Sequence, residues 1–304
     1  MKARGYLFAA LAAAAYGTNP IFAKPLYAAG MNPDSVLLFR YLLALLLMGT
    51  IMFWSVIRKR NESKSFSETF RVERHSLPQL ILMGLLMSAS SILLFMSYNF
   101  MPVGIASTLL FVYPIMVAVI MTLCYHERMS WLVVACLALA SIGVALLSRP
   151  KGETETLYDA NSFMTGFALV MASSLSYAIY LVGLNKTRIR TIATMSVTFY
   201  VLLFGLAVYL FRLAFGVPLV IPHTMSMWLN CLGLGFFPTV ISLIFTSLAI
   251  QSIGSTQTAL LGAFEPFTAV ALGMVVLGES ITLQESIGML LVFLAVTMVI
   301  RRRS

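Results

Sequence analysis

The sequence contains little charge. Only 10% of its 304 residues are charged, 60% are hydrophobic, and the mean hydropathy is +0.93. A soluble domain carries about 25% charged residues. The composition therefore excludes a soluble globular protein and predicts an all-α polytopic protein of the lipid bilayer, with little chain left for any soluble domain.

Cysteine and histidine are also scarce. The three cysteines, Cys124, Cys136 and Cys231, lie in or at the edge of apolar runs, which indicates packing residues and no disulfide framework. All three histidines lie in loops or at helix ends. Without a His/Asp/Glu cluster or a Ser–His pair, we expect no enzyme, no metal and no cofactor. No Walker motif is present, so the expected energy source is an ion gradient or the substrate's own gradient.

Acidic residues are fewer than basic ones. The chain has 11 Asp and Glu against 20 Lys and Arg, a net charge of +9. This excess does not indicate a nucleic-acid partner, because 15 of the 20 basic residues fall at the termini and in alternate loops. That distribution follows the positive-inside rule and predicts cytoplasmic termini in a plasma (inner) membrane.

Long apolar runs dominate what remains. A spanning helix needs about 20 apolar residues, and ten runs approach or exceed that length: 5–29, 33–57, 77–98, 102–123, 129–147, 162–183, 191–215, 224–250, 253–278 and 281–300. The first run resembles a signal peptide over residues 1–15, but it continues well past the cleavage-like site. We interpret all ten as transmembrane helices.

The two halves of the chain resemble each other. Three matches carry this similarity: Ser97–Gly104 with Ser247–Gly254, Tyr113-Pro114 with Glu265-Pro266, and Tyr16–Lys24 with Tyr177–Asn185. Chance similarity of apolar segments is the alternative, but a Pro and a Glu lie 13 residues apart in both halves. Five spans is an odd number, so the second half is inverted. Inverted repeats are typical of transporters, with the substrate at the midplane between them. We divide the chain into a first repeat (1–148), an external linker (149–161) and a second repeat (162–304).

These motifs resemble the drug/metabolite transporter superfamily, EamA type. The matching features are the first-helix stretch Tyr16–Lys24, the second-helix Arg40, and the repeated Pro…Glu-Arg element at Pro114…Glu127-Arg128 and Pro266…Glu279-Ser280. Tyr16 stands where Trp is usual, Tyr125-His126 where Leu-Gly is usual, and Ser280 where Arg is usual. The resemblance implies ten helices, alternating access and, in many members, export of amino acids or other small metabolites.

Glu265 is the only acid well inside an apolar run, where a carboxylate costs roughly 2.5–3.5 kcal/mol on insertion scales. Pro266 cannot donate to the carbonyl of Gly262, which predicts a free backbone acceptor beside the acid. Glu265 either binds a substrate amine or carries a coupling proton, or it pairs with Lys24 or Arg40 and only fixes packing.

Other candidates follow from helical spacing and helix breaks. The face that carries Thr258, Gly262, Glu265 and Thr268 suits a cavity or a tight helix contact. Pro20 and Asn19 either break their helix around a ligand or only kink it. We expect several tyrosines to line a pocket, although tyrosines of membrane helices are more often interfacial anchors or core packing residues. The predicted lining residues are Glu265, Asn19, Thr18, Tyr16, Tyr113, Tyr177, Tyr180, Thr258 and Thr268; the predicted hinges are Pro20, Pro114, Pro238, Pro266 and Gly262; the predicted charge partners are Lys24 and Arg40.

The sequence thus predicts a secondary transporter of a small organic metabolite, an amino acid or related compound, working outward. The alternatives are an importer or exchanger of nucleosides or sugars, a scaffold or channel, and a membrane-embedded enzyme. Proton coupling and a homodimer stay open.

Overall fold

In the computed structural model the described residues are 2–58, 72–101, 106, 109–127, 129–147, 160–277 and 282–301, and they contain helices and turns but no strand. Five helical stretches among them are long and apolar enough to cross a membrane: Pro33–Trp54, Arg74–Ser97, Ser162–Lys186, Thr194–Ala214 and Met225–Ile253. The predicted all-α polytopic membrane fold is confirmed.

The helices of the first repeat are α1 (Lys2–Gly17), α2 (Asn19–Ala28), α3 (Pro33–Arg58), α5 (Leu77–Ser97), α7 (Tyr113–Tyr125) and α8 (Trp131–Leu147). Those of the second are α9 (Ala160–Lys186), α10 (Thr194–Ala214), α11 (Met225–Gly235), the π-helical η4 (Phe236–Ile241), α12 (Ser242–Ile253), α13 (Ser255–Leu261), α14 (Phe264–Leu277) and α15 (Leu283–Arg301). Short 3₁₀ turns precede α5 (Arg74–Ser76) and α10 (Arg188–Thr191). Among the described residues, breaks divide four of the predicted spans: into α1 and α2, into α11, η4 and α12, into α13 and α14, and at the turn 111–112 into the helical residues 109–110 and α7.

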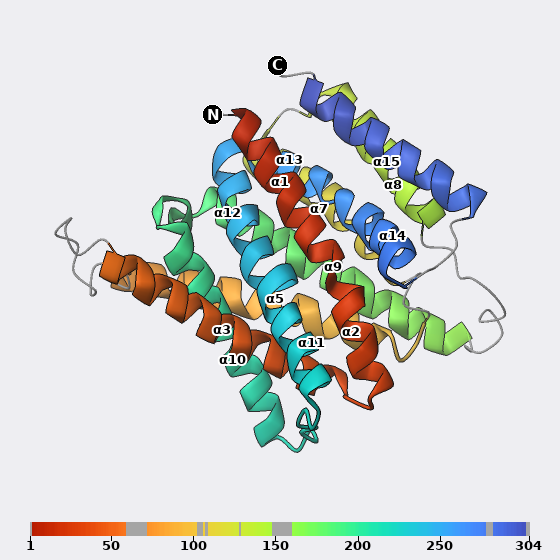
Figure 1. Cartoon of the computed structure of the whole chain (residues 1–304). Coiled ribbons are helices and arrows are strands. Elements are labelled where there is room, and N and C mark those ends of the chain that lie inside the picture. The colour runs from red at the N-terminus through yellow and green to blue at the C-terminus, as the bar shows by residue number, and fades with distance from the viewer. Residues whose placement is uncertain are drawn as a thin grey trace.

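The packing of these helices is symmetric between the repeats. Helix α1 packs against α12 and α14, just as its counterpart α9 packs against α5 and α7. Helix α3 packs against α11, as α10 packs against α5, while the pairs α3–α10 and α8–α15 join counterparts directly. Exchanging the repeats therefore maps each contact onto another, which is the pseudo-two-fold arrangement that inverted repeats produce. The start of α1 and the end of α15 lie at the same end of the bundle (Figure 1).

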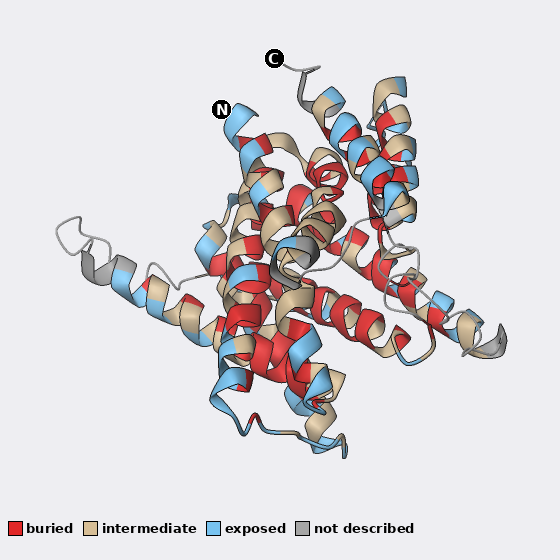
Figure 2. Ribbon diagram, turned by 45° about the vertical axis from the view of Figure 1, so that its right-hand side comes forward, coloured by how far each residue is buried: buried red, intermediate tan, exposed pale blue. Residues whose placement is uncertain are grey.

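Burial follows this arrangement. Figure 2 shows buried residues concentrated in the middle of the bundle and exposed ones on its outer faces and ends. Large apolar side chains are among the most exposed, including Trp54, Trp131, Phe215 and Leu283. In a membrane these side chains face lipid tails as apolar as themselves, so their exposure carries no hydrophobic penalty.

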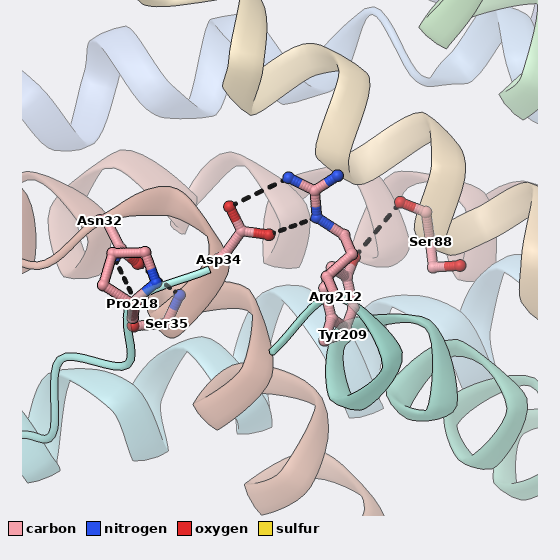
Figure 3. Close-up of polar contacts among 7 residues, drawn as sticks. All are labelled: Asn32, Asp34, Ser35, Ser88, Tyr209, Arg212 and Pro218. Carbon is pink, nitrogen blue, oxygen red and sulfur yellow. Dashed lines mark hydrogen bonds and ion pairs between the residues drawn. The ribbon is translucent and has the colours of Figure 1, made fainter. Parts of the chain in front are cut away.

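A cluster of polar contacts joins the repeats at the end of the bundle away from the termini (Figure 3). Arg212, late in α10, donates from Nε to Asp34 Oδ1 at 2.6 Å and from Nη2 to Asp34 Oδ2 at 3.4 Å. The Asn32 side chain donates to the Pro218 carbonyl at 2.7 Å. Because the Arg–carboxylate pair is bidentate and only partly exposed, it holds the start of α3 against the end of α10.

Several sequence predictions fall outside the described residues. These are most of the linker, residues 149–159; residues 102–104 of the matched stretch Ser97–Gly104; and, in the repeated element, Arg128, Gly278, Glu279 and Ser280. The last two linker positions, Ala160 and Asn161, begin α9.

Candidate functional site

A small cavity lies where the two repeats meet. Six helices line it, α1, α7, α9, α12, α13 and α14, through Ala9, Ala12, Ala13, Tyr16, Tyr113, Tyr177, Leu181, Ser242, Thr246, Thr258, Ala259, Gly262 and Glu265. Its volume is about 20 Å³, enough for about one water molecule, which needs roughly 10–15 Å³. In this conformation the site is closed to anything as large as a metabolite.

Positions that match between the repeats meet at this central cavity. Tyr16 and Tyr177 are counterparts, and so are Tyr113 and Glu265, and all four line it. The cavity therefore lies between the matched elements of the two repeats, where inverted-repeat transporters bind their substrates.

A helix break places Glu265 at the cavity. Helix α13 ends at Leu261 and α14 begins at Phe264, so Glu265 lies in the first turn of α14. The partial positive charge of a helix N-terminus stabilises a carboxylate there. The prediction of a free acceptor at Gly262 is wrong, since its carbonyl accepts a hydrogen bond from the Glu265 backbone N–H at 2.9 Å. At the break the backbone forms an i→i+3 hydrogen bond between the Gly262 carbonyl and the Glu265 N–H. This bond replaces the i→i+4 bond that Pro266 cannot donate.

Tyrosine rings form another part of the cavity wall. The Tyr113 ring meets the Tyr177 ring edge-on with centroids 4.9 Å apart. The Tyr113 hydroxyl lies so close to Gly262 that no larger residue fits there. Tyr180 stacks on Tyr177 at 5.9 Å but is buried in the core and does not line the cavity.

The predicted polar face of the ninth span serves two purposes. Thr258, Gly262 and Glu265 line the cavity, but Thr268 does not. Thr268 instead packs against α1, where a Cβ added to Gly17 would lie 2.8 Å from the Thr268 Cβ and 2.5 Å from the Glu265 carbonyl oxygen. The face is thus both the cavity wall and the tight helix contact that its small residues predict.

The break between α1 and α2 lies at Thr18, two residues beyond Tyr16. The Thr18 hydroxyl donates to the Ala15 carbonyl at 2.7 Å, and α2 begins at Asn19 with Pro20 in its first turn. Neither Thr18 nor Asn19 lines the cavity. The Asn19 side-chain oxygen is buried and has no hydrogen-bond donor, which leaves a polar atom unsatisfied beside the break.

The predicted charge partners do not hold Glu265 in an ion pair. Arg40 is buried and its guanidinium lies 5.5 Å from the centroid of the Tyr16 ring. Its Nε donates to Thr239 Oγ1 at 2.7 Å and its Nη2 to the Pro238 carbonyl at 3.2 Å. Lys24 is exposed on α2 and lies outside the cavity lining. Arg40 therefore binds the backbone and side chains of η4, and Glu265 is left to face the cavity.

The predicted proline hinges take different positions. Pro114 is buried in the first turn of α7, where a proline starts a helix without cost. Pro238 lies inside the π-helical turn η4, a type of helix defect that is frequent at functional sites. Pro20 and Pro266 each lie in the first turn after a break.

The sequence reasoning missed the contribution of α12. Ser242 and Thr246 lie one helical turn apart and both line the cavity. Two hydroxyl residues four positions apart inside an apolar run share one face of a helix, and this spacing is the signal that could have identified them. At the matching positions of the first repeat, 150 residues earlier, stand Ile92 and Met96.

A second hollow, which we call the vestibule, opens near the termini end of the bundle. Its volume is about 430 Å³, and it is lined by Glu127, Asn185, Lys186, Arg190, Ser252, Ile253, Gly254, Ser255, Thr256 and Gln257. Helix α13 links the two hollows, with Ser255 in the vestibule and Thr258 in the central cavity. Between them, the Asn185 side chain donates to Ser255 Oγ at 3.1 Å in a buried contact.

Comparisons with known proteins identify a family, two related transporters and a solved structure with the same fold. The sequence model of the EamA-like transporter family matches residues 3–149 and 164–301. An uncharacterized transporter of Archaeoglobus fulgidus is 29% identical over 187 residues, which cover 61% of this chain and 63% of that protein. One of Synechocystis sp. is 28% identical over 229 residues, covering 71% of this chain and 64% of that protein. The chain thus spans less than two thirds of either relative. A solved crystal structure has the same fold, with a TM-score of 0.82 and 15% identity over 100% of this chain and 99% of that one.

Proposed function

The chain belongs to the EamA-like transporter family, and on this premise we propose that it is a secondary transporter of a small organic metabolite that carries a protonated amine. An amino acid or related compound is the first choice of substrate, and export is the first choice of direction. The two repeats move against each other by alternating access around the central cavity.

One observation carries this proposal: matched positions of the two repeats converge on a cavity that contains the acid Glu265. A carboxylate at this depth is expensive to insert, so its presence there indicates a function by default. It faces a cavity and forms no ion pair with the one buried arginine nearby. A substrate ammonium group is the partner that its charge and position suit best.

Proton exchange is the coupling that we propose at this carboxyl group. The cavity is too small to hydrate a lone carboxylate well, so Glu265 keeps a positive partner in either state: a proton when the site is empty and a substrate ammonium when it is loaded. Release of one accompanies capture of the other, which exchanges a proton for each substrate molecule.

The positions of the central cavity and the vestibule support transport of the substrate from the inside to the outside. The vestibule has the size of a metabolite and ends one helical turn from the cavity, at the Asn185–Ser255 contact. The other end of the bundle is held by the Asp34–Arg212 ion pair. With the termini in the cytoplasm, as the basic residues predict, this conformation admits substrate from inside. Breakage of the ion pair and closure of the vestibule then release it outside.

A second candidate substrate is a flat heterocycle such as a nucleoside. Tyr16, Tyr113 and Tyr177 supply three aromatic rings to the cavity wall, and aromatic rings stack on planar ligands. Competition by nucleosides but not by amino acids would favour this candidate.

The test is transport by the Glu265→Gln variant in proteoliposomes, with Glu73→Gln as the matched control. Loss of a charge-assisted hydrogen bond at a buried site costs about 1.5–3 kcal/mol, so we expect uptake of the amine-bearing substrate to fall about 10- to 100-fold and its dependence on a pH gradient to disappear. Glu73 lies just before the 3₁₀ turn that precedes α5, is largely exposed and lines neither hollow, so its variant keeps both properties. Unchanged uptake and unchanged pH dependence in Glu265→Gln would refute the proposed role of the acid.

A further inference from the structure

Arg40 is the most deeply buried cation among the described residues. It lies in the second turn of α3, and only 1% of its surface is exposed. An arginine side chain stays protonated in proteins. Its burial therefore places a permanent positive charge inside the bundle.

The contacts of Arg40 hold the guanidinium group but do not neutralise it. Nε donates to the Thr239 hydroxyl at 2.7 Å, and Nη2 donates to the Pro238 carbonyl at 3.2 Å. Both acceptors are neutral and both belong to the π-helical turn η4, whose own Thr239 hydroxyl donates to the Leu234 carbonyl at 2.7 Å. The third nitrogen, Nη1, is buried and has no hydrogen-bond acceptor.

No ion pair joins Arg40 to a carboxylate within the described part of the chain, although Glu265 lies near enough for the two charges to attract each other. The partly exposed Arg212, by contrast, has a bidentate carboxylate partner in Asp34 (Figure 3). Arg40 has no such direct partner, although a buried ion without one is among the costliest arrangements in a protein. Two N–H groups on Nη1 thus remain available to an anion.

Arg40 is separated from the central cavity by a single ring. The guanidinium carbon lies 5.5 Å from the centroid of Tyr16, and Tyr16 lines the cavity together with Glu265. Tyr16 lies in the last turn of α1, directly before the break at Thr18. A shift of that turn, as alternating access requires, would bring Nη1 into contact with the contents of the cavity.

We propose that Arg40 Nη1 binds a carboxylate group of the transported molecule. This inference rests on the proposed function and deepens it: Glu265 takes the amine and Arg40 takes the acid, so the ligand is a zwitterion. A carboxylate suits the site better than a phosphate, because one negative charge matches the one cation that lacks an ion-pair partner and a phosphate dianion would leave a surplus. The stacking of Arg40 on Tyr16 without any ligand is the competing account, in which the cation serves packing alone.

The experiment measures anion binding apart from transport, with formate as the probe. The purified full-length protein is heated in detergent with potassium formate or with potassium chloride at the same ionic strength. A ligand that binds only the folded state raises the Tm, and we expect formate to raise it by about 2–4 °C over chloride at a concentration about tenfold above its Kd.

Three variants decide where formate binds. Arg40→Gln loses the formate effect, and Arg212→Gln, which removes an arginine that already has its carboxylate, keeps it. Arg40→Lys keeps the charge but lacks Nη1, so it folds more readily than Arg40→Gln and binds formate at least threefold more weakly than the wild type. An equal Tm in formate and chloride overturns the inference, and so does a formate effect that survives in Arg40→Gln or is undiminished in Arg40→Lys.

The result is independent of the test of the proposed function. If formate does not raise the Tm over chloride while Glu265→Gln abolishes transport, only the carboxylate site at Arg40 is wrong. If Glu265→Gln transports normally, the proposed function fails whatever formate does.

Discussion

The two repeats pack their helices in the same way but present different chemistry to the cavity. On the second-repeat side stand Ser242, Thr246 and Glu265, where the first repeat has Ile92, Met96 and Tyr113. Packing between α-helices depends mainly on size and spacing, so it tolerates such exchanges. A duplicated scaffold thus leaves each copy free to acquire its own polar groups, and the second repeat supplies most of those at this site.

Helix continuity differs between the repeats as well. Residues 17–20 of the first repeat, Gly-Thr-Asn-Pro, end α1 and start α2, whereas the matching residues 178–181, Ala-Ile-Tyr-Leu, lie inside the unbroken α9. In the eighth span Pro238 lies in a π-helical turn, while its counterpart Ser88 lies within the regular helix α5. The breaks occur where proline removes a backbone donor, and they lie beside the site.

The contact between α1 and α14 offers the largest expected effect. In Gly17→Ala the new Cβ would lie 2.5 Å from the Glu265 carbonyl oxygen, and overpacking of this kind costs about 1–3 kcal/mol. Thermal unfolding in detergent should show a lower Tm. The control is Gly49→Ala in α3, whose Cβ would meet only Phe199 at 3.9 Å, so that it is neutral or gains up to about 1 kcal/mol from helix propensity. Equal Tm values for the two variants would show that α1 does not approach α14 this closely.

The helix break in the first repeat is tested next. Pro20→Leu gives this position the residue found at Leu181 in the unbroken α9. Proline in the first turn of a helix costs little, so we expect stability to stay within about 1 kcal/mol. We expect the transport rate to fall about tenfold, because the repeats can no longer bend at this point.

Pro25→Leu is the matched control for this variant. Pro25 lies inside α2 and is exposed, so its replacement leaves the break at Thr18 intact and the rate near that of the wild type. Equal rates for both proline variants would mean that the difference between α1–α2 and α9 has no part in transport.

The polarity of α12 predicts the smallest effect. Ser242→Ala removes one hydroxyl from the cavity wall, and a net hydrogen bond is worth about 0.5–1.5 kcal/mol, so substrate affinity in a binding assay should weaken about two- to tenfold. Ser247→Ala removes a buried hydroxyl from the same helix outside the cavity lining and should leave affinity unchanged. A larger loss in Ser247→Ala than in Ser242→Ala would place the second repeat's polar contribution elsewhere.

Much of the fold was predictable because membrane insertion constrains sequence so strongly. The apolar runs identified the helices, and the matches at Tyr113-Pro114 and Glu265-Pro266 identified the repeats. Glu265 was found because an acid at that depth is conspicuous in an apolar run. Ser242 and Thr246 were missed because a hydroxyl is inexpensive there and common in helices that pack tightly.

What the sequence determined by itself is the set of local properties: which segments are apolar, where proline interrupts them, and which charges they contain. The tertiary structure decided which of these properties meet. It bound Arg40 to Thr239 and Pro238 instead of to Glu265, and it placed Thr268 in a contact with α1. These outcomes depend on distances between segments far apart in the chain, and helix periodicity within one segment does not specify them.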